Sequence, residues 1–380
     1  MHERVVLVPV LLLCACGSTD PKPSAGADEA AVVRQYAVNL DANYKAVIDK
    51  VQGLQSAVGD FVANPSESGL EAARQAWLDA RPAYGECEIS RFYGGPMDAA
   101  QGGMNEWPID ETFVDYTTDS PLGGIINDTA DYPEISEAVL RSTDERGGIE
   151  NLSTGFHAIE FLLWGQRPDQ TSGPGERPYT DYLDGGTAAN QDRRRLYLTT
   201  AVDMLLSDMQ ALDAEWDLTN GESYGAMMVA GSAHDGLTNI VRGFTNLGIS
   251  ELFYERLEDP YVTQDRKDEE SCFSESTIID LTANAKGVEN VYLGRYADQQ
   301  GPSVSDLVKA KDPALDTEIK AEISAARAAI AAIPTPFDHS VIAPPTSDDN
   351  LKVRAAIDAF QPMQDTLKRM ADVLGVPINL

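Results

Sequence analysis

The chain has 380 residues, with 61 acidic against 29 basic side chains and a formal charge of −32 at pH 7. This balance argues against a nucleic acid as partner, because binding a polyanion requires clustered Lys and Arg. The acidic excess is spread along the chain, so it indicates solubility and a weak attraction for cations.

The N-terminus has the features of an export signal. An apolar run follows Arg4 and is shorter than the about 20 residues that span a bilayer. Residues 13–17, with the sequence LCACG, look like a bacterial lipobox in which Cys16 is lipidated. We therefore predict a signal peptide over residues 1–16 and a flexible tether over residues 17–30. A signal peptide that is cleaved without lipidation is the alternative.

Two further cysteines, Cys87 and Cys272, remain after this processing. In an oxidising compartment, an even pair is compatible with a disulfide that joins the two halves of the chain. Two separate buried thiols fit the sequence equally well, so both alternatives stay open.

Helical periodicity dominates the mature chain. Apolar residues recur at helical spacing over residues 31–62, and a second helix is predicted from about Leu70 to Ala83. Strand patterns are scarce, and further long helices are predicted at about 188–216, 224–257, 313–333 and 349–374. We expect an all-α fold of two helical-bundle-like halves, at about residues 31–186 and 187–375.

Charged and aromatic side chains alternate closely between Tyr84 and Asp98. Glu88 and Arg91 lie among them, so this stretch is either part of a site or a knot of caps and salt bridges. The segment that follows, residues 99–132, contains Gly and Pro and no long periodic run. Loops of this length in compact domains are usually functional or disordered, and the aromatic residues here argue for packing.

The run GFHAIEFLLWGQ at residues 155–166 is the strongest candidate for a functional site. His157 and Glu160 are three residues apart, so a helix would place both on one face. The surrounding residues are apolar, which predicts a buried helix. A buried carboxylate needs a partner, since an unpaired one costs several kcal/mol or becomes protonated. The pair is half of a metal site, a base with its acidic partner, or a structural hydrogen bond.

A second run, GVENVYLGR at residues 287–295, has a similar pattern and suggests an ancient duplication. Both runs begin with Gly and contain an apolar stretch that ends in Gly. The overlay places Glu289 at the position of His157 and Tyr292 at the position of Glu160. If the repeat is real, the two copies should superpose.

The pattern Gly155-x-His157-x-x-Glu160 resembles the signature of the imelysin family of bacterial envelope proteins. Supporting blocks occur in the same order at residues 73–98, at residues 105–110, and in ESCFSES followed by GVENVYLGRY. The resemblance covers about residues 31–375. It implies an all-α fold of two bundle-like halves in an exported protein, often lipid-anchored, that is tied to iron regulation or uptake.

We expect a divalent metal ion as the ligand, with iron favoured and zinc as the second choice. His157 and Glu160 would be direct ligands, and Glu88, Asp98 and Asp110 are candidates for the remaining oxygen ligands. Asp98 and Asp110 fit equally well as helix caps.

Other residues would support the site or stand apart from it. Arg91 would orient one of the carboxylates. His234 and His339 are expected to be a partly exposed helix residue and a loop residue. The family pattern carries histidines near the CFS segment, where this chain has Glu270 and Ile278. A metal site formed by those histidines would be weakened or lost here.

The favoured function is a lipid-anchored protein of the bacterial cell envelope, on the outer membrane and facing the periplasm or the cell surface. Its partners would be the membrane, through the anchor, and envelope proteins of iron uptake. A metal-dependent peptidase with Glu160 as ligand or general base is the alternative, although no His-Glu-x-x-His motif or third ligand is evident. An interaction module with a purely structural His–Glu pair is the third interpretation.

Overall fold

The computed structural model describes residues 28–167 and 173–378, and nearly all regular structure in these ranges is helical. The predicted all-α class is therefore confirmed. The predicted signal peptide with Cys16 lies outside the described residues. Within the described ranges, no helix is both long and apolar enough to cross a membrane.

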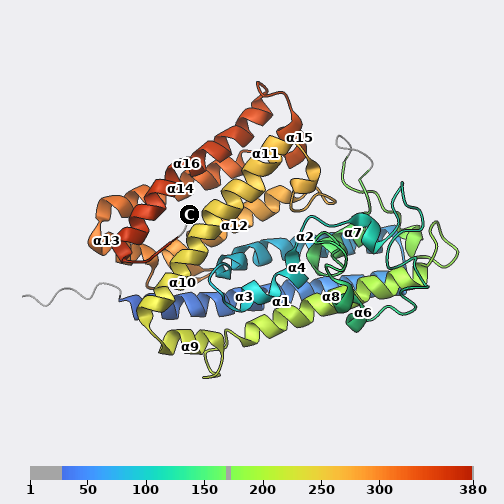
Figure 1. Ribbon diagram of the computed structural model, residues 1–380, viewed down its shortest axis with the longest axis horizontal. Coiled ribbons are helices and arrows are strands. Elements are labelled where there is room, and N and C mark those ends of the chain that lie inside the picture. The colour runs from blue at the N-terminus through green and yellow to red at the C-terminus, as the bar shows by residue number, and fades with distance from the viewer. Residues whose placement is uncertain (1–27, 168–172, 379–380) are drawn as a thin grey trace, which may run out of the picture.

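The lower layer in Figure 1 is built on two long helices joined by a short connection. Helix α1 (Glu29–Ala63) packs along α2 (Glu67–Cys87), and Asp28 and Ser66 cap their first turns by accepting backbone N–H bonds. Helix α8 (Gln191–Ala214) lies on the other side of α1, and α9 (Tyr224–Ala230) packs against α1 as well.

The upper layer contains the C-terminal helices (Figure 1). Helix α14 (Pro313–Ala331) packs between α12 (Thr277–Leu293) and α16 (Asp348–Leu374), with the shorter α13 (Val304–Lys311) and α15 (Phe337–Ile342) at the ends. A small antiparallel hairpin of β1 (Arg295–Tyr296) and β2 (Gln299–Gln300) follows α12. Helix α12 also packs against α2, so it joins the two layers.

One continuous helical rod crosses from the lower layer to the upper layer (Figure 1). It begins as α10 (Ala233–Asn246), continues as the π-helix η3 (Leu247–Glu258) and ends as α11 (Asp259–Thr263). Long π-helices are rare, and π segments occur often at functional sites. Helices α8 to α10 pack against α1, so the predicted division at residues 186/187 does not coincide with the packing. The upper bundle begins only within this rod.

Short helices form the segments that connect the long ones. They are η1 (Glu88–Ser90), α3 (Pro96–Ala100), α4 (Gly102–Asn105), α5 (Glu111–Val114), α6 (Glu137–Thr143), η2 (Tyr179–Tyr182) and η4 (Arg266–Asp268). The long segment over residues 99–132 is packed, as its aromatic residues predicted. The Arg193 guanidinium fixes it by donating to the carbonyl oxygens of Ile125, Ile126 and Tyr132.

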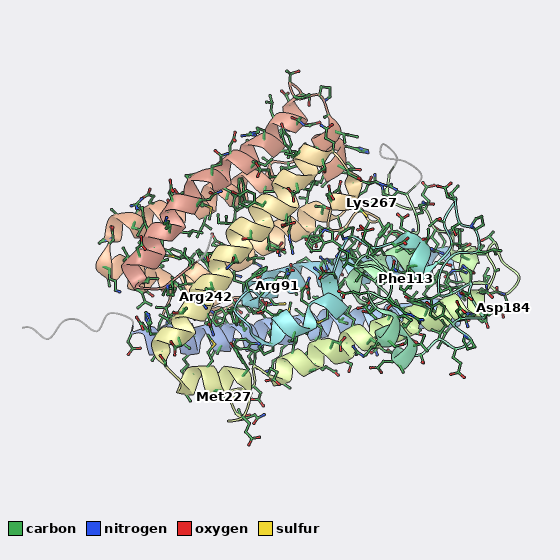
Figure 2. The ribbon with its side chains drawn as sticks, in the orientation of Figure 1. Arg91, Phe113, Asp184, Met227, Arg242 and Lys267 are labelled. Atoms are coloured by element: carbon green, nitrogen blue, oxygen red, sulfur yellow. The ribbon has the colours of Figure 1, made fainter. Side chains whose placement is uncertain are left out.

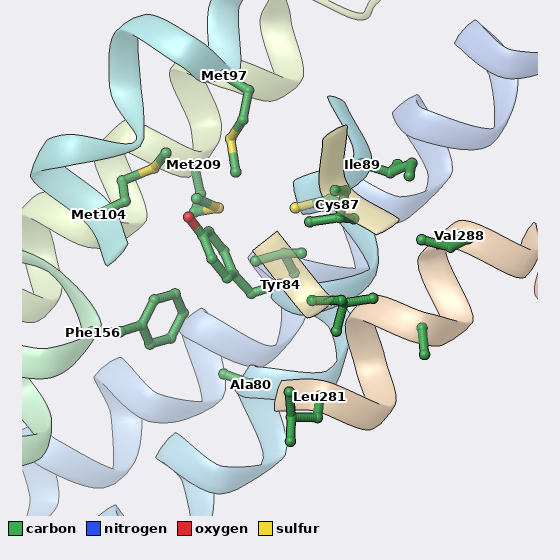
Figure 3. Close-up of a cluster of buried hydrophobic side chains, with 14 of the residues drawn as sticks. Ala80, Tyr84, Cys87, Ile89, Met97, Met104, Phe156, Met209, Leu281 and Val288 are labelled. Atoms are coloured by element: carbon green, nitrogen blue, oxygen red, sulfur yellow. The ribbon is translucent and has the colours of Figure 1, made fainter. Parts of the chain in front are cut away.

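Helix α7 (Gly155–Trp164) is the predicted signature helix, and all of its residues are buried. Its first residue has a left-handed backbone with φ of +84° and lies against the carbonyl group of Met104. The Trp77 indole donates to the Phe156 carbonyl oxygen at 2.9 Å and ties α7 to α2. Figure 3 shows Phe156 facing Tyr84 in this core, and the two ring centroids are 4.9 Å apart.

The proposed internal repeat does not occupy equivalent places in the fold. Gly155 is the first residue of α7, whereas Gly287 lies in the middle of α12. Glu289 pairs with Arg295 and Arg327 and has no counterpart to the contacts of His157. The short sequence match therefore gives no support for a duplication.

Replacing Gly155 with Ala should destabilise the protein by roughly 2–4 kcal/mol, because a Cβ would lie 2.6 Å from the Met104 carbonyl oxygen and the backbone is left-handed. Gly53→Ala is the matched control, since this exposed mid-helix glycine has no atom within 4 Å of an added Cβ. The Gly53→Ala substitution should raise the free energy of unfolding by about 0.5–1 kcal/mol. Urea unfolding of both variants checks the prediction, and equal stabilities would contradict it.

Candidate functional site

His157 and Glu160 contact each other directly on the buried face of α7. The Nδ1 atom of His157 lies 2.9 Å from Oε2 of Glu160, and both side chains are almost completely inaccessible. The i to i+3 spacing thus produces the expected shared face, and of the sequence-based alternatives the observed contact matches the hydrogen-bonded pair. The two side chains bind one another and do not converge on a common third point.

The second oxygen of Glu160 is held from the other half of the chain. Ser274, in the loop before α12, donates its backbone N–H at 2.8 Å and its hydroxyl at 2.7 Å to Oε1. With His157 on Oε2, both carboxylate oxygens of Glu160 have partners. Glu160 is therefore a positioning residue for His157, which corrects the prediction that it is a direct ligand.

The other ring nitrogen of His157 is available. Its Nε2 atom is buried and has no hydrogen-bond partner in the described part of the chain. His157 lines a small cavity of about 20 Å³, together with Trp107, Glu269, Glu270 and Cys272. When Nδ1–H donates to Glu160, Nε2 carries the free lone pair that a metal or a proton requires.

Burial changes the protonation of both members of the pair. Burial, with the positive charge of Arg81, lowers the pKa of His157 to about 3, so the imidazole is neutral at pH 7. Burial also raises the pKa of Glu160 to about 7, against the opposing effect of the Ser274 hydrogen bonds. The imidazole is therefore in the form that binds metals.

A network of buried charges surrounds the pair. The Arg81 guanidinium donates to Asp280 at 2.7 Å and to Glu270 at 2.8 Å. Arg256, on η3, donates to Glu270 at 2.7 Å and to Glu88 at 3.0 Å. These side chains are essentially inaccessible, and they connect α2, η1, η3 and α12.

Glu88 and Arg91 belong to this network. Glu88 is buried, and despite that burial Arg256 holds its pKa down at about 2. Arg91 donates to Glu88 at 3.2 Å and to Glu251 at 3.4 Å, and Figure 2 shows it beside the helical rod that carries Glu251. The salt-bridge knot is thus the correct alternative for this stretch, and the structure does not place Glu88 as a metal ligand.

Asp98 and Asp110 are both caps. Asp98 accepts the backbone N–H groups of residues 92–95 and so fixes the turn before α3. Asp110 is the N-cap of α5 and accepts from Thr112 N–H at 2.9 Å. Neither carboxylate lines the cavity at His157, so the prediction that they complete a metal site there is wrong.

The cysteines are not joined. Cys87 and Cys272 are both free thiols, and burial raises the pKa of each well above its usual value. In Figure 3, Cys87 lies in the hydrophobic core near Met97, whereas Cys272 lines the cavity at His157. Two separate thiols is therefore the correct alternative.

An acidic pocket adjoins the site. It has a volume of about 390 Å³ and shares Trp107 and Pro108 with the small cavity. Its lining includes five carboxylates, from Glu106, Glu251, Glu255, Asp259 and Asp268. The Arg256 guanidinium stacks on Trp107 at 4.7 Å from the ring centroid, and Trp107 lies 6.2 Å from the His157 ring. Trp107 therefore stands between a negatively charged pocket and His157.

Comparison with known proteins identifies the family. The imelysin family model (Peptidase_M75) matches residues 40–367, which is most of the chain. The chain belongs to the imelysin family. It is 26% identical over 337 residues to the iron-regulated protein A of Synechococcus elongatus, an alignment that covers 86% of this chain and 81% of that one.

Two solved structures share the imelysin fold. A crystal structure from Parabacteroides distasonis, provisionally named as an iron-regulated protein A precursor, has a TM-score of 0.72 at 21% identity and covers 94% of this chain and 97% of its own. An imelysin-like protein from Psychrobacter arcticum has a TM-score of 0.63 at 13% identity, and the alignment covers 92% of this chain and 97% of that one. At these identities, the two structures establish the shared fold alone.

The neutral, buried state of His157 predicts a pH-dependent stability. The unfolded chain takes up a proton on this histidine below pH ~6.5, whereas the folded chain resists protonation down to about 3. This contribution to stability is present above pH 6.5 and is lost as the pH falls towards 3.

Between pH 6.5 and pH 4.5, we expect the free energy of unfolding of His157→Gln to fall by roughly 2 kcal/mol less than that of the parent. Chemical unfolding in the presence of a chelator measures the difference. The exposed His234 provides the control, and His234→Gln should follow the parent curve. Parallel curves of unfolding free energy against pH for the parent and His157→Gln would contradict a lowered pKa of His157 in the folded protein.

Proposed function

We propose that this imelysin-family protein binds a divalent metal ion, iron in preference, in the bacterial cell envelope in support of metal uptake. One observation carries the proposal: His157 presents a buried, unpartnered Nε2 atom to a cavity while Glu160 holds its other nitrogen. A histidine oriented by a carboxylate in this way is the usual arrangement of a metal-binding imidazole. The name of the Synechococcus relative, iron-regulated protein A, supports iron as the metal.

The donors around Nε2 fit such an ion in kind. Glu269 and Glu270 line the same cavity, and Oε1 of Glu269 is buried without a hydrogen-bond partner. A mixture of imidazole nitrogen and carboxylate oxygen suits iron, zinc or manganese. The described residues do not hold three such ligand atoms within 4.8 Å of one another at His157, so water, or a carboxylate brought closer by the loop that carries Glu269, would complete the coordination.

The acidic pocket provides an approach for a cation. Arg91 lines it with the five carboxylates, and Arg256 pairs with one of them, Glu251, so negative charge remains in excess and attracts cations. A cation in this pocket lies against Trp107, which also lines the cavity at His157. The route from solvent to the imidazole would therefore pass the Trp107 side chain.

The geometry favours binding over peptide hydrolysis. A catalytic zinc normally has three protein ligands and an open position that faces the substrate. The cavity of about 20 Å³ at His157 holds about one water-sized group, which leaves no room for a peptide segment. The peptidase alternative needs an opening much larger than the movement of one loop residue.

Metal titration tests the proposal. The purified protein should bind Fe²⁺ under anoxic conditions in calorimetry, and His157→Ala should weaken this binding by roughly tenfold or more because the imidazole is the nitrogen donor. His234→Ala is the matched control, since His234 is half-exposed and far from the cavity lining. Equal binding by the parent and His157→Ala would remove the basis of the proposed site.

The envelope location is tested at the N-terminus. Cells that express the full chain should incorporate labelled palmitate into it, and Cys16→Ser should abolish the label because the thiol is the acceptor. Cys14→Ser is the matched control and should keep the label. Labelling that survives Cys16→Ser would contradict the predicted lipobox.

A further inference from the structure

A second group of ligand-type side chains lies where the loop before α12 meets α15. The carboxylates of Glu275 and Asp338 and the imidazole of His339 each place one ligand atom within 4.8 Å of the others. In residues 28–167 and 173–378, this is the one set of three such atoms with that spacing. Sequence spacing does not group these residues, because Asp338 and His339 are 63 residues or more from Glu275 along the chain.

The cluster has more negative than positive charge. Arg167, at the end of the signature region, donates to Asp338 at 2.8 Å and to Glu275 at 2.5 Å. Glu269 is a third carboxylate and is buried, as Asp338 is, whereas Glu275 is partly buried. Glu269 lines a cavity of about 10 Å³ with Asp338 and Arg266. Three carboxylates thus lie around this region, and the Arg167 guanidinium contacts two of them. Such an excess of buried charge is costly unless protons or another cation offset it.

Two polar atoms in this region have no partner. The Glu269 side chain is 3% exposed, its Oε2 accepts from Thr277, and its Oε1 has no hydrogen-bond partner. The Nε2 atom of His339 is also buried without a partner. Folded proteins rarely leave such atoms bare, and a bound ion is one of the established reasons when they do. The unpartnered Glu269 oxygen is an observation independent of the spacing of the three ligand atoms.

We propose that Glu275 and His339, with Asp338 beside them, bind a second divalent transition-metal ion, and that Glu269 lies between this site and the cavity at His157. One imidazole with carboxylates is a donor set that iron, zinc and manganese accept. Arg167 holds one oxygen each of Asp338 and Glu275, and the His339 backbone N–H donates to the other Asp338 oxygen at 2.8 Å. The second Glu275 oxygen and Nε2 of His339 are therefore the atoms left for the ion. Glu269 lines both cavities, so its carboxylate can face either site. This site extends the proposed function and does not depend on binding at His157.

A cation that enters the cluster would offset the negative charge that Arg167 leaves. The competing interpretation is that Arg167 alone completes the cluster as a structural ion pair.

Zn²⁺ stoichiometry on the full chain separates these interpretations. The parent should bind two ions in equilibrium dialysis, and His339→Ala should bind one. Glu275→Gln, which keeps the size of the side chain, should weaken the same ion by roughly tenfold or more. His234→Ala is the control for binding to an exposed histidine and should match the parent. Thermal unfolding in chelator verifies that each variant is folded.

The His157→Ala variant distinguishes this site from the proposed function. If His157→Ala retains one ion that His339→Ala removes, the second site stands. If His157→Ala changes nothing and His339→Ala removes the only ion, the second site stands while binding at His157 fails. The second site is overturned if His339→Ala and Glu275→Gln bind as the parent does, or if His157→Ala abolishes all binding.

Discussion

The hydrogen bonds from Ser274 to Glu160 are the contact on which the geometry of the site depends. They join the signature helix of the lower layer to the loop that leads into α12 of the upper layer. With one carboxylate oxygen held by Ser274, the other is directed at Nδ1 of His157. The free Nε2 then has to face the cavity beneath the loop that carries Glu269 and Glu270. A contact between bundles therefore decides which nitrogen of His157 is available.

The buried ion pairs around Arg81 and Arg256 support this arrangement at an energetic cost. Moving such charges out of water costs several kcal/mol per ion, and the pairs recover it only where geometry is good and other hydrogen bonds are satisfied. Here Asn105 accepts a further hydrogen bond from Arg81 and Asn284 one from Arg256, while Nε of Arg256 has no partner in the described part of the chain. The positive charge near His157 then helps to keep the imidazole neutral. A hydrophobic substitute of equal volume could preserve packing, but it would not set this protonation state.

Local patterns in the sequence were sufficient for the long helices and for the His157–Glu160 pair. Apolar spacing located α1, α2 and α8, and the i to i+3 rule placed both signature side chains on one face. The patterns could not tell a ligand from a cap, because the Asp98 and Asp110 carboxylates serve equally well as acceptors for backbone N–H groups. Ser274 is 114 residues from Glu160, so no spacing rule connects them. Periodicity likewise does not show which helices pack together, and the contacts of α8 to α10 with α1 are visible only in the fold.

The residue at position 270 affects which metal the site would prefer. Where the family pattern has histidines nearby, this chain has Glu270, and both Arg81 and Arg256 bind its carboxylate. Of the other groups in the cavity lining, the Cys272 thiol has a pKa that burial raises well above its usual value, and Glu269 has an oxygen without a partner. A single imidazole among carboxylates is a donor set that suits iron or manganese. Structural zinc sites are typically richer in nitrogen and sulfur donors.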